Sequence, residues 1–277
     1  MNMDMFLDLV CSEDIGRGDL FEGLVSEDFR VNAIIRAKQD GILSGILYAK
    51  RLCERYGLEI VFFKEDAQTF NKGDILLEVK GLYSIVLRLE RCILNLLQHS
   101  SGIATLTKSY VDILKESYPD VALLDTRKTR PTLRVFEKYS VRNGGGRNHR
   151  IGLDDALMLK DTHLKYIAES DLKNFLKKAR HRIPWTSKIE VESESVEFAK
   201  VAMAAGADIV MCDNMSIQKI MEVVEYRNQK YPNILLEASG DIRKEKLLEV
   251  AATGVDAISS GALIHQATWV DMHMKLL

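Results

Sequence analysis

The sequence is poor in the features that mark several classes of protein. Its 277 residues include only 4 Pro and 17 Gly, which excludes a collagen-like or low-complexity chain. No apolar run approaches the roughly 18 residues of a membrane span, so we expect none. The first eight residues lack a basic cluster and contain two aspartates, so we expect no secretory signal. The 38 basic and 40 acidic residues nearly cancel, which excludes a globally basic nucleic-acid binder.

Cysteine is also scarce, and its spacing does not suggest a metal site. The four cysteines are scattered, form no CxxC pair and have no His at zinc spacing; they are Cys11, Cys53, Cys92 and Cys212. We therefore interpret them as reduced thiols of a cytoplasmic protein.

Residues 1–105 alternate helical and extended patterns. Strands are predicted over residues 31–38, 58–63 and 74–80, and helices over 4–10, 44–56 and from Ser84 onward. These segments predict an α+β domain of about 100 residues.

Residues 106–277 have a different rhythm, in which short apolar runs alternate with helical segments. The runs cover residues 121–125, 156–160, 188–192, 208–213, 234–239 and 255–259. Such alternation is typical of buried parallel strands, and it predicts an α/β barrel that is incomplete, with about six to seven strands. A last helix over residues 265–277 is expected to pack back on the first domain.

Each apolar run ends in a polar or charged residue. The terminal residues are Asp125, Lys160, Glu192, Asp213, Ser239 and Ser259. Sites in βα-barrels are built at the carboxyl ends of the strands, so we expect these residues to surround one site.

A basic segment follows the first of these strands. Residues 127–150 contain eight Lys or Arg residues but a single acid, Glu137, together with three consecutive glycines at 144–146. A solvated basic face and nucleic-acid binding are the competing interpretations. The glycines and the position at a strand end favour a ligand loop, whose arginines suit a small substrate with several negative charges.

The other strand ends suggest more specific chemistry. Lys160 could form a Schiff base if desolvation removed its proton, or could bind anions as an ammonium group. Glu192 and Asp213 suit Mg²⁺ held jointly with substrate phosphates. They could instead accept hydrogen bonds from sugar hydroxyls or support a cationic transition state, and Glu190 could replace Glu192. The glycines of Ser239-Gly240 and Ser260-Gly261 would let backbone N–H groups approach a phosphate. His149 could donate to a substrate carboxylate or act as an acid, although a lone His is more often structural.

The blocks that carry these residues resemble the quinolinate phosphoribosyltransferase family, also called nicotinate-nucleotide pyrophosphorylase (carboxylating). The resemblance covers nearly the whole chain and rests on DTRKT (125–129), EKYSVRNGGGRNHR (137–150), LMLKDTH (157–163), EVE (190–192), CDN (212–214), LEASG (236–240) and ISSGALIH (258–265). The sequence departs from the commonest residues of that family at Arg130, Thr132, Arg147 and Thr162, and the roles of Arg130 and Arg147 stay open.

This resemblance implies a fold, a reaction and a set of roles. The fold would be an N-terminal α/β sandwich domain (residues 1–105) and an incomplete α/β barrel (residues 106–277) in a homodimer or a larger assembly such as a hexamer. The pentosyltransferase reaction would join quinolinate to 5-phosphoribosyl 1-diphosphate with Mg²⁺, giving nicotinate mononucleotide, pyrophosphate and CO₂ in NAD biosynthesis. The residues would act as follows: Arg127, His149, Arg150 and Lys160, with Arg91 of the partner subunit, on quinolinate; Lys128 on the diphosphate; Glu192 and Asp213 on ribose and metal; Ser239, Gly240, Ser260 and Gly261 on phosphate.

Other activities remain open for a chain with these motifs. A related enzyme could use nicotinate without decarboxylation, or serve metal transport, although several cationic residues favour a dicarboxylate. A Schiff-base lyase or an RNA-binding module fits less well, because the resemblance makes Lys160 an anion binder and the chain is net acidic.

Overall fold

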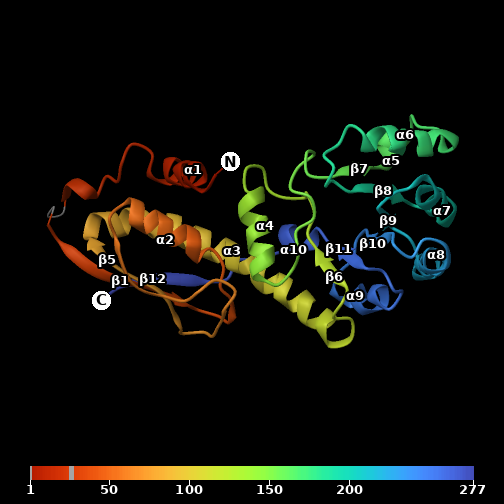
Figure 1. Ribbon diagram of the computed structural model, residues 1–277. Helices are drawn as coiled ribbons and strands as arrows, with labels where there is room; N and C mark the ends of the chain where they lie inside the picture. The colour runs from red at the N-terminus through yellow and green to blue at the C-terminus, as the bar shows by residue number, and fades with distance from the viewer. Residues whose placement is uncertain (1, 25–27) are drawn as a thin grey trace. The chain divides into compact units, whose positions relative to one another are not determined.

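The computed structural model describes residues 2–24 and 28–277, which form two compact units (Figure 1). The first unit draws on residues 1–108, 135–145 and 267–277, and the second on residues 109–134 and 146–266. The predicted domains, 1–105 and 106–277, are continuous stretches, whereas the first unit takes two further segments from the later part of the chain.

An antiparallel sheet in the order β12-β1-β5-β3 forms the centre of the first unit. Its strands are β1 (Arg30–Ala37), β3 (Glu59–Phe63), β5 (Ile75–Leu82) and β12 (Met272–Leu276), and β2 (Gly41–Ile42) pairs separately with β4 (Thr69–Phe70). Ala33 and Ile35 lie opposite Val79 and Leu77 and are at most 1% exposed, so this face of the sheet lies in the core. The helical segments are α1 (Met3–Ile15), η1 (Glu22–Leu24), α2 (Ile46–Arg55), α4 (Arg134–Asn143) and the first part of α3 (Tyr83–Ser117).

A parallel sheet of six strands forms the second unit, in the order β6-β11-β10-β9-β8-β7. The strands are β6 (Ala122–Leu124), β7 (Leu157–Leu159), β8 (Ile189–Ser193), β9 (Ile209–Asp213), β10 (Leu235–Ser239) and β11 (Ala257–Ser259). Strands β7 to β11 are neighbours in chain order and β6 joins them beside β11, as in a barrel left open between β6 and β7. This arrangement agrees with the predicted incomplete α/β barrel.

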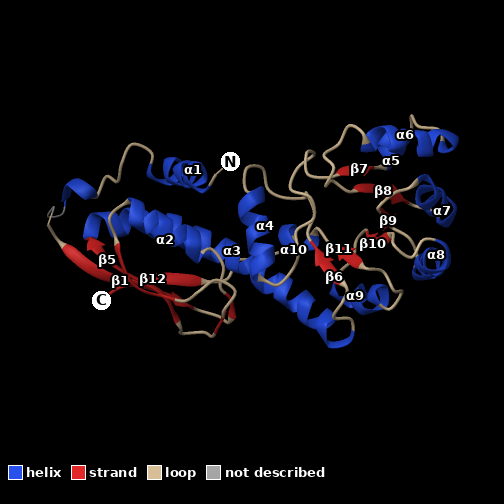
Figure 2. Ribbon diagram, in the orientation of Figure 1, coloured by secondary structure: helices blue, strands red, loops and turns tan. Residues whose placement is uncertain are grey.

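Helices connect the strands of this barrel, and α6, α7 and α8 lie outside the strands in Figure 2. The helical segments are α5 (Asp161–Leu164), η2 (Glu169–Asp171), α6 (Leu172–Arg180), α7 (Val196–Ala205), α8 (Ile217–Lys230), α9 (Lys244–Ala251) and α10 (Ala262–His265). Because all six strands run in one direction, their carboxyl ends meet at one edge of the sheet. The polar residues that follow the strands are therefore brought together there.

The predicted helix over residues 265–277 is wrong. Only His265 is helical, at the end of α10, and Met272–Leu276 forms strand β12, which pairs antiparallel with β1 of the first unit. The apolar residues Val270, Met272, Met274 and Leu276 recur every second position, which is the period of a strand. The segment does return to the N-terminal unit, but as an edge strand.

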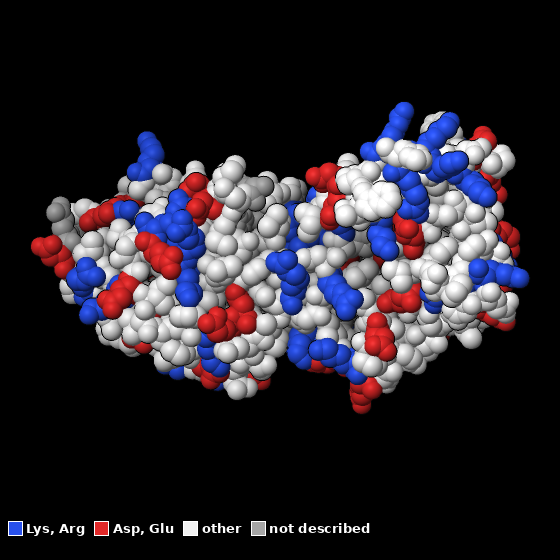
Figure 3. Space-filling model, in the orientation of Figure 1, with Lys and Arg blue, Asp and Glu red and all other residues white. Residues whose placement is uncertain are grey.

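Two further findings concern the surface and the cysteines. No helix in the described ranges is long and apolar enough to cross a membrane. All four cysteines are buried and unpaired. Figure 3 shows charges of both signs scattered over one face, with Lys and Arg gathered at the upper right, where Figure 1 draws the basic helix α6.

Candidate functional site

A cavity of about 490 Å³ opens at the carboxyl ends of the strands in the second unit. Its lining combines cationic, acidic and small polar side chains from every strand end: Thr126, Arg127, Lys128, His149, Arg150, Met158, Lys160, Glu192, Met211, Asp213, Asn214, Glu237, Ser239, Gly240, Asp241 and Ser259. Nine of the predicted site residues are in this list, so the barrel topology brings them together as expected.

Two arginines supply much of the positive charge of the cavity. Arg150 is 9% exposed and donates from Nη1 to the carbonyl of Ala156 at 3.2 Å, while Nη2 lies 3.4 Å from the sulfur of Met158. Burial, and then the charge of Arg127, lowers the pKa of Arg150 below its usual value. The Nε of Arg127 is buried and has no hydrogen-bond partner among the described residues. Arg127 thus has an unused buried donor, and Arg150 carries a charge that burial disfavours, as in a site that receives an anion.

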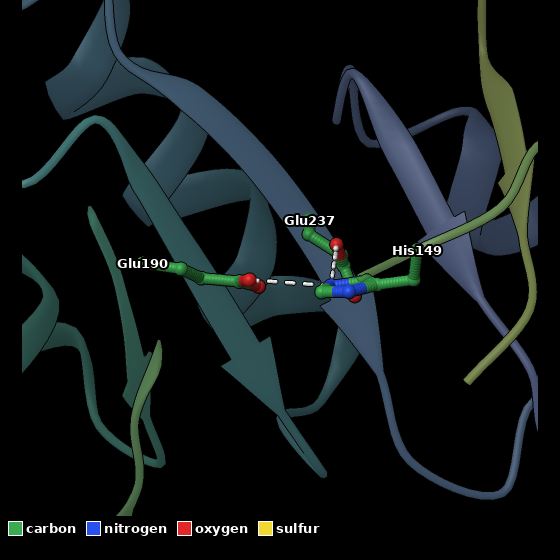
Figure 4. Close-up of side chains that lie close together, drawn as sticks. All are labelled: His149, Glu190 and Glu237. Atoms are coloured by element: carbon green, nitrogen blue, oxygen red, sulfur yellow. Dashed lines mark ion pairs between the residues drawn. The ribbon is translucent and has the colours of Figure 1, made fainter. Parts of the chain in front are cut away.

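His149 lies between two buried glutamates (Figure 4). Its Nε2 is 3.2 Å from an oxygen of Glu190 on β8 and 3.3 Å from one of Glu237 on β10. Its backbone N–H donates to Asp125 at 2.9 Å, which anchors the segment to the end of β6. Burial opposes the charged ring, but the hydrogen bonds to the two glutamates outweigh it and raise the pKa of His149 to about 10.

Lys160 forms an ion pair with Glu192 rather than with its neighbour Asp161. Leu159 of β7 is level with Val191 of β8, so the next residues of the two strands, Lys160 and Glu192, lie side by side. Glu192 is 7% exposed, whereas the Lys160 side chain is 41% exposed. A Schiff-base lysine usually lies in an apolar pocket or beside another cation, whereas Lys160 is paired with an acid and partly exposed, so its surroundings suit anion binding better.

Asp213 and the glycine of the next loop are coupled through Asn214. The Asn214 amide donates to the Asp213 carboxylate at 2.7 Å, and its backbone N–H donates to the carbonyl of Ser239 at 3.1 Å. Gly240 has a φ of +100°, and a Cβ there would lie 2.2 Å from the Asn214 side-chain oxygen. Glycine is therefore required at this position.

A smaller lobe of about 170 Å³ adjoins the cavity and contains the remaining Ser-Gly pair. Ser260 and Gly261 line this lobe together with Lys128, Ser239 and Gly240. The Ser260 hydroxyl donates to the carbonyl of Ile242 at 2.8 Å, and its backbone N–H donates to Leu124 at 3.0 Å. Both Ser260 donors are thus used inside the protein, which leaves Ser260 to contribute shape more than donors.

The basic segment does not form one patch. Of its eight basic residues only Arg127, Lys128 and Arg150 line the cavity. Residues 135–145 belong to the first unit, and Lys138 is buried there at 1% exposed. Arg134 instead braces the loop, donating to Thr129 at 3.1 Å and to the carbonyl of Ile151 at 3.3 Å.

Arg91 is the predicted site residue that stands apart. It lies on α3 in the first unit, is exposed and is not among the residues lining the cavity. Its predicted role belongs to a partner subunit.

Sequence reasoning missed Glu237, Asn214 and Asp241. Glu237 had a signal, because an acid inside the apolar run 234–239 is unusual unless it is paired. Glu190, considered only as a substitute for Glu192, instead pairs with His149. Asn214 had no such signal, because its role depends on the approach of the next loop.

The arrangement can hold a compact polyanion. Arginine, lysine and histidine line one part, and small residues with an open backbone line another, beside two acids at adjacent strand ends. Guanidinium groups bind carboxylate or phosphate through two oxygens, and glycine loops suit phosphate.

Known proteins are similar to this chain in sequence and in fold. Models of the N-terminal and C-terminal domains of quinolinate phosphoribosyl transferase match residues 19–101 and 103–275. Two proteins named "Probable nicotinate-nucleotide pyrophosphorylase (carboxylating)" are similar: one from Synechocystis is 36% identical, covering 99% of this chain and 92% of the relative, and one from Bacillus subtilis is 39% identical, covering 95% and 90%. The solved nicotinate-nucleotide pyrophosphorylase from Francisella tularensis has a TM-score of 0.89 at 33% identity, covering 100% of this chain and 98% of that one. The chain therefore belongs to the quinolinate phosphoribosyl transferase family.

Proposed function

We infer that this protein is a pentosyltransferase that transfers the phosphoribosyl group of 5-phosphoribosyl 1-diphosphate to quinolinate with loss of CO₂. The products are nicotinate mononucleotide and pyrophosphate, and the reaction serves NAD biosynthesis. The observation that carries this inference is the cavity with Arg127, Lys128, His149, Arg150 and Lys160 on its walls, in a chain of this family. Both substrates are small polyanions, which this charge pattern suits.

The quinolinate carboxylates would bind to Arg127, Arg150 and Lys160, beside His149. The buried, unpartnered Nε of Arg127 supports this placement, because an unsatisfied charged donor is costly until a ligand accepts from it. Arg150 gains for the same reason, since burial and Arg127 already disfavour its charge. Two carboxylates on adjacent ring carbons match several cations better than one carboxylate does.

We propose that Arg91 completes the site from a second subunit of a homodimer or a larger homo-oligomer. Its side chain is exposed on α3, so it is available to a partner. We place the enzyme in the cytoplasm, a proposal supported by four unpaired cysteines.

The phosphoribosyl donor would lie toward Lys128 and the Ser-Gly loops. Lys128, Ser239 and Gly240 line both lobes of the cavity, and Gly261 lines the smaller one. Gly240 has a positive φ and no side chain, as is common in loops whose backbone N–H groups bind phosphate oxygens. Ser260 would support this loop through its bond to Ile242.

The residues also fit a magnesium ion held mostly by substrate. Asp213 and Glu192 end adjacent strands and line the cavity, and carboxylate oxygens are ligands that Mg²⁺ accepts. Asp213 is held by an amide, whereas Glu192 is neutralised by Lys160, so Asp213 is the stronger candidate for direct contact. The bound ion would neutralise charge on the departing pyrophosphate.

The chain's own residues would contribute position and charge. Arg127, Arg150 and Lys160 would orient the pyridine ring so that its nitrogen faces C1 of the ribosyl group. Glu192 and Asp213 would stabilise the positive charge that develops at C1 as pyrophosphate leaves in a dissociative step. Bond formation makes the ring nitrogen cationic, and its charge would stabilise the electron pair left on the neighbouring ring carbon when the adjacent carboxylate departs as CO₂. A proton taken up from solvent would then complete the carbon–hydrogen bond of the product.

Turnover with quinolinate, 5-phosphoribosyl 1-diphosphate and Mg²⁺ tests this function. We expect nicotinate mononucleotide from the wild type and a loss of at least about tenfold in kcat/KM for quinolinate in Arg127→Ala and in Lys160→Ala. Arg147→Ala is the matched control, because Arg147 is an exposed arginine of the same segment outside the cavity. Equal losses in all three variants would show a general charge effect and would contradict the assigned contacts.

A further inference from the structure

Two buried carboxylates, Glu237 in the cavity wall and Glu190 outside its lining, lie around His149 in a site that suits anions. Glu190 and Glu237 are 1% and 2% exposed, and each has one oxygen with no hydrogen-bond partner among the described residues. Alone, they would repel an anionic ligand and carry a large desolvation cost. Both point at the imidazole of His149, from strands on either side of β9 (Figure 4). Their placement therefore indicates that they act on the His149 ring and not directly on the ligand.

The hydrogen bonds around the ring fix which edge carries a proton. Nδ1 accepts from the backbone N–H of Arg150 at 2.7 Å, so the proton of the neutral ring lies on Nε2, between the two glutamates. The glutamates also favour a second proton, which would replace the Arg150 contact at Nδ1. Two charge-assisted bonds outweigh one neutral contact between adjacent residues, so the ring is cationic at neutral pH. In either charge state Nε2 is a donor, which argues against a metal ion held by these three residues.

We propose that Glu190 and Glu237 are positioning residues, which hold the imidazole of His149 by its Nε2–H and keep the ring cationic beside Arg127 and Arg150. This proposal rests on the proposed function for its substrate, quinolinate. The Nε2–H is then taken up by the two glutamates, so His149 acts on the substrate carboxylates through its positive charge and through Nδ1. A neutral glutamine pair would leave a ring that burial alone pushes toward the uncharged form.

Several other charged groups bear on the same ring. Arg150 adjoins it, Asp125 holds its backbone from the end of β6, and Arg127 and Glu192 line the same cavity. Their presence means that a pH effect must be assigned to His149 by direct observation.

Nuclear magnetic resonance of histidine labelled with ¹⁵N tests the proposal on the full chain without substrate. The signal of His149 is identified by its absence in His149→Gln. We expect the wild-type ring not to titrate below about pH 8, and Glu190→Gln with Glu237→Gln together to lower its pKa to 6.5 or less. A wild-type His149 that titrates near 6.5 would overturn the proposal, and this readout does not depend on the double glutamine variant.

Kinetics give the second readout. In the double glutamine variant we expect KM for quinolinate at pH 8 to rise about tenfold, while KM for the phosphoribosyl donor stays unchanged. Glu222→Gln, which breaks a surface ion pair with Lys200, is the matched control and should change neither constant. A rise in both KM values would indicate general damage and would overturn the positioning role.

Two outcomes separate this proposal from its neighbours. Stoichiometric binding of Zn²⁺ that disappears in Glu190→Gln would make the three residues a metal site and overturn the proposal. A wild type inactive with quinolinate would refute the proposed function, and the quinolinate role of the two glutamates with it. The titration of His149 would still decide whether they hold the ring as a cation.

Discussion

Replacing Arg150 by Met should change stability and substrate affinity in different directions. Arg150 is 9% exposed, and its protein contacts are the carbonyl of Ala156 at 3.2 Å and the sulfur of Met158 at 3.4 Å. Burial and the neighbouring Arg127 both disfavour its charge, as the lowered pKa of Arg150 records. The charges of Glu190 and Glu192 favour the guanidinium but do not outweigh these two effects, so a bound anion would recover a cost that remains. Met fills a similar length without a charge.

The expected magnitudes follow from these contacts. Losing the bond to Ala156 costs about 1.5 kcal/mol, whereas replacing buried ion-paired groups by apolar side chains of similar volume is often neutral or gains about 1 to 4 kcal/mol. The free energy of unfolding should thus stay the same or rise by about 2 kcal/mol. Losing a charged contact to quinolinate costs about 1.5 to 3 kcal/mol, or roughly 10-fold to 150-fold in affinity.

Urea unfolding with and without quinolinate measures both effects. At 100 times the wild-type Kd, quinolinate should stabilise the wild type by about 2.7 kcal/mol and the Arg150→Met variant by about 1.4 kcal/mol or less. A variant that loses more than about 3 kcal/mol of stability while binding quinolinate normally would refute the reasoning, because Arg150 would then be a structural residue.

Three further predictions concern other parts of the second unit. Gly240→Ala should lose about 1 to 3 kcal/mol of stability by urea unfolding, because φ is +100° and a Cβ there meets Asn214. The same change should raise KM for the phosphoribosyl donor, and a normal KM would contradict the loop assignment. Asp256→Asn should lose about 1 to 3 kcal/mol of stability by urea unfolding, because it breaks the 2.6 Å ion pair with buried Arg227. It should leave kcat unchanged, and a kcat defect would instead place this pair in the catalytic machinery. His149 binds its proton more tightly in the folded protein, because its pKa rises from 6.5 to about 10. Its contribution to the free energy of unfolding is therefore full below pH 6.5 and is lost as the pH rises toward 10. The free energies of unfolding of the wild type and of His149→Gln, measured from pH 6 to 10, should converge by at most about 5 kcal/mol.

The barrel could be predicted from the sequence because its strands are buried on both faces. Such strands appear as continuous apolar runs, and all six were located within about two residues of their observed ends. Parallel strands then meet at one edge, so polar residues such as Asp125, Lys160 and Asp213 converge without further information.

Contacts between neighbouring strands could not be predicted in the same way. The partner of Lys160 depends on the register of β7 against β8, which places Glu192 beside it. Glu237 pairs with His149 only because the chain order of the barrel brings β10 near the segment after α4. Periodicity within one segment carries no information on which segment lies opposite.

The last strand shows the complementary limit. Met272–Leu276 has the two-residue apolar period of a strand, but its partner is β1, more than 200 residues earlier. A terminal segment that completes a distant sheet gives no local sign of that partner, so position at the end of a barrel wrongly favoured a helix.

The most direct test of the central claim compares two bases in parallel. Purified protein receives 5-phosphoribosyl 1-diphosphate and Mg²⁺ with either quinolinate, labelled in its 2-carboxylate, or nicotinate, and mononucleotide and labelled CO₂ are quantified. We expect mononucleotide and CO₂ in equal amounts from quinolinate, and kcat/KM at least about tenfold lower for nicotinate, which lacks one carboxylate contact. Equal use of nicotinate, or no product from either base, would contradict a site built for a pyridine dicarboxylate.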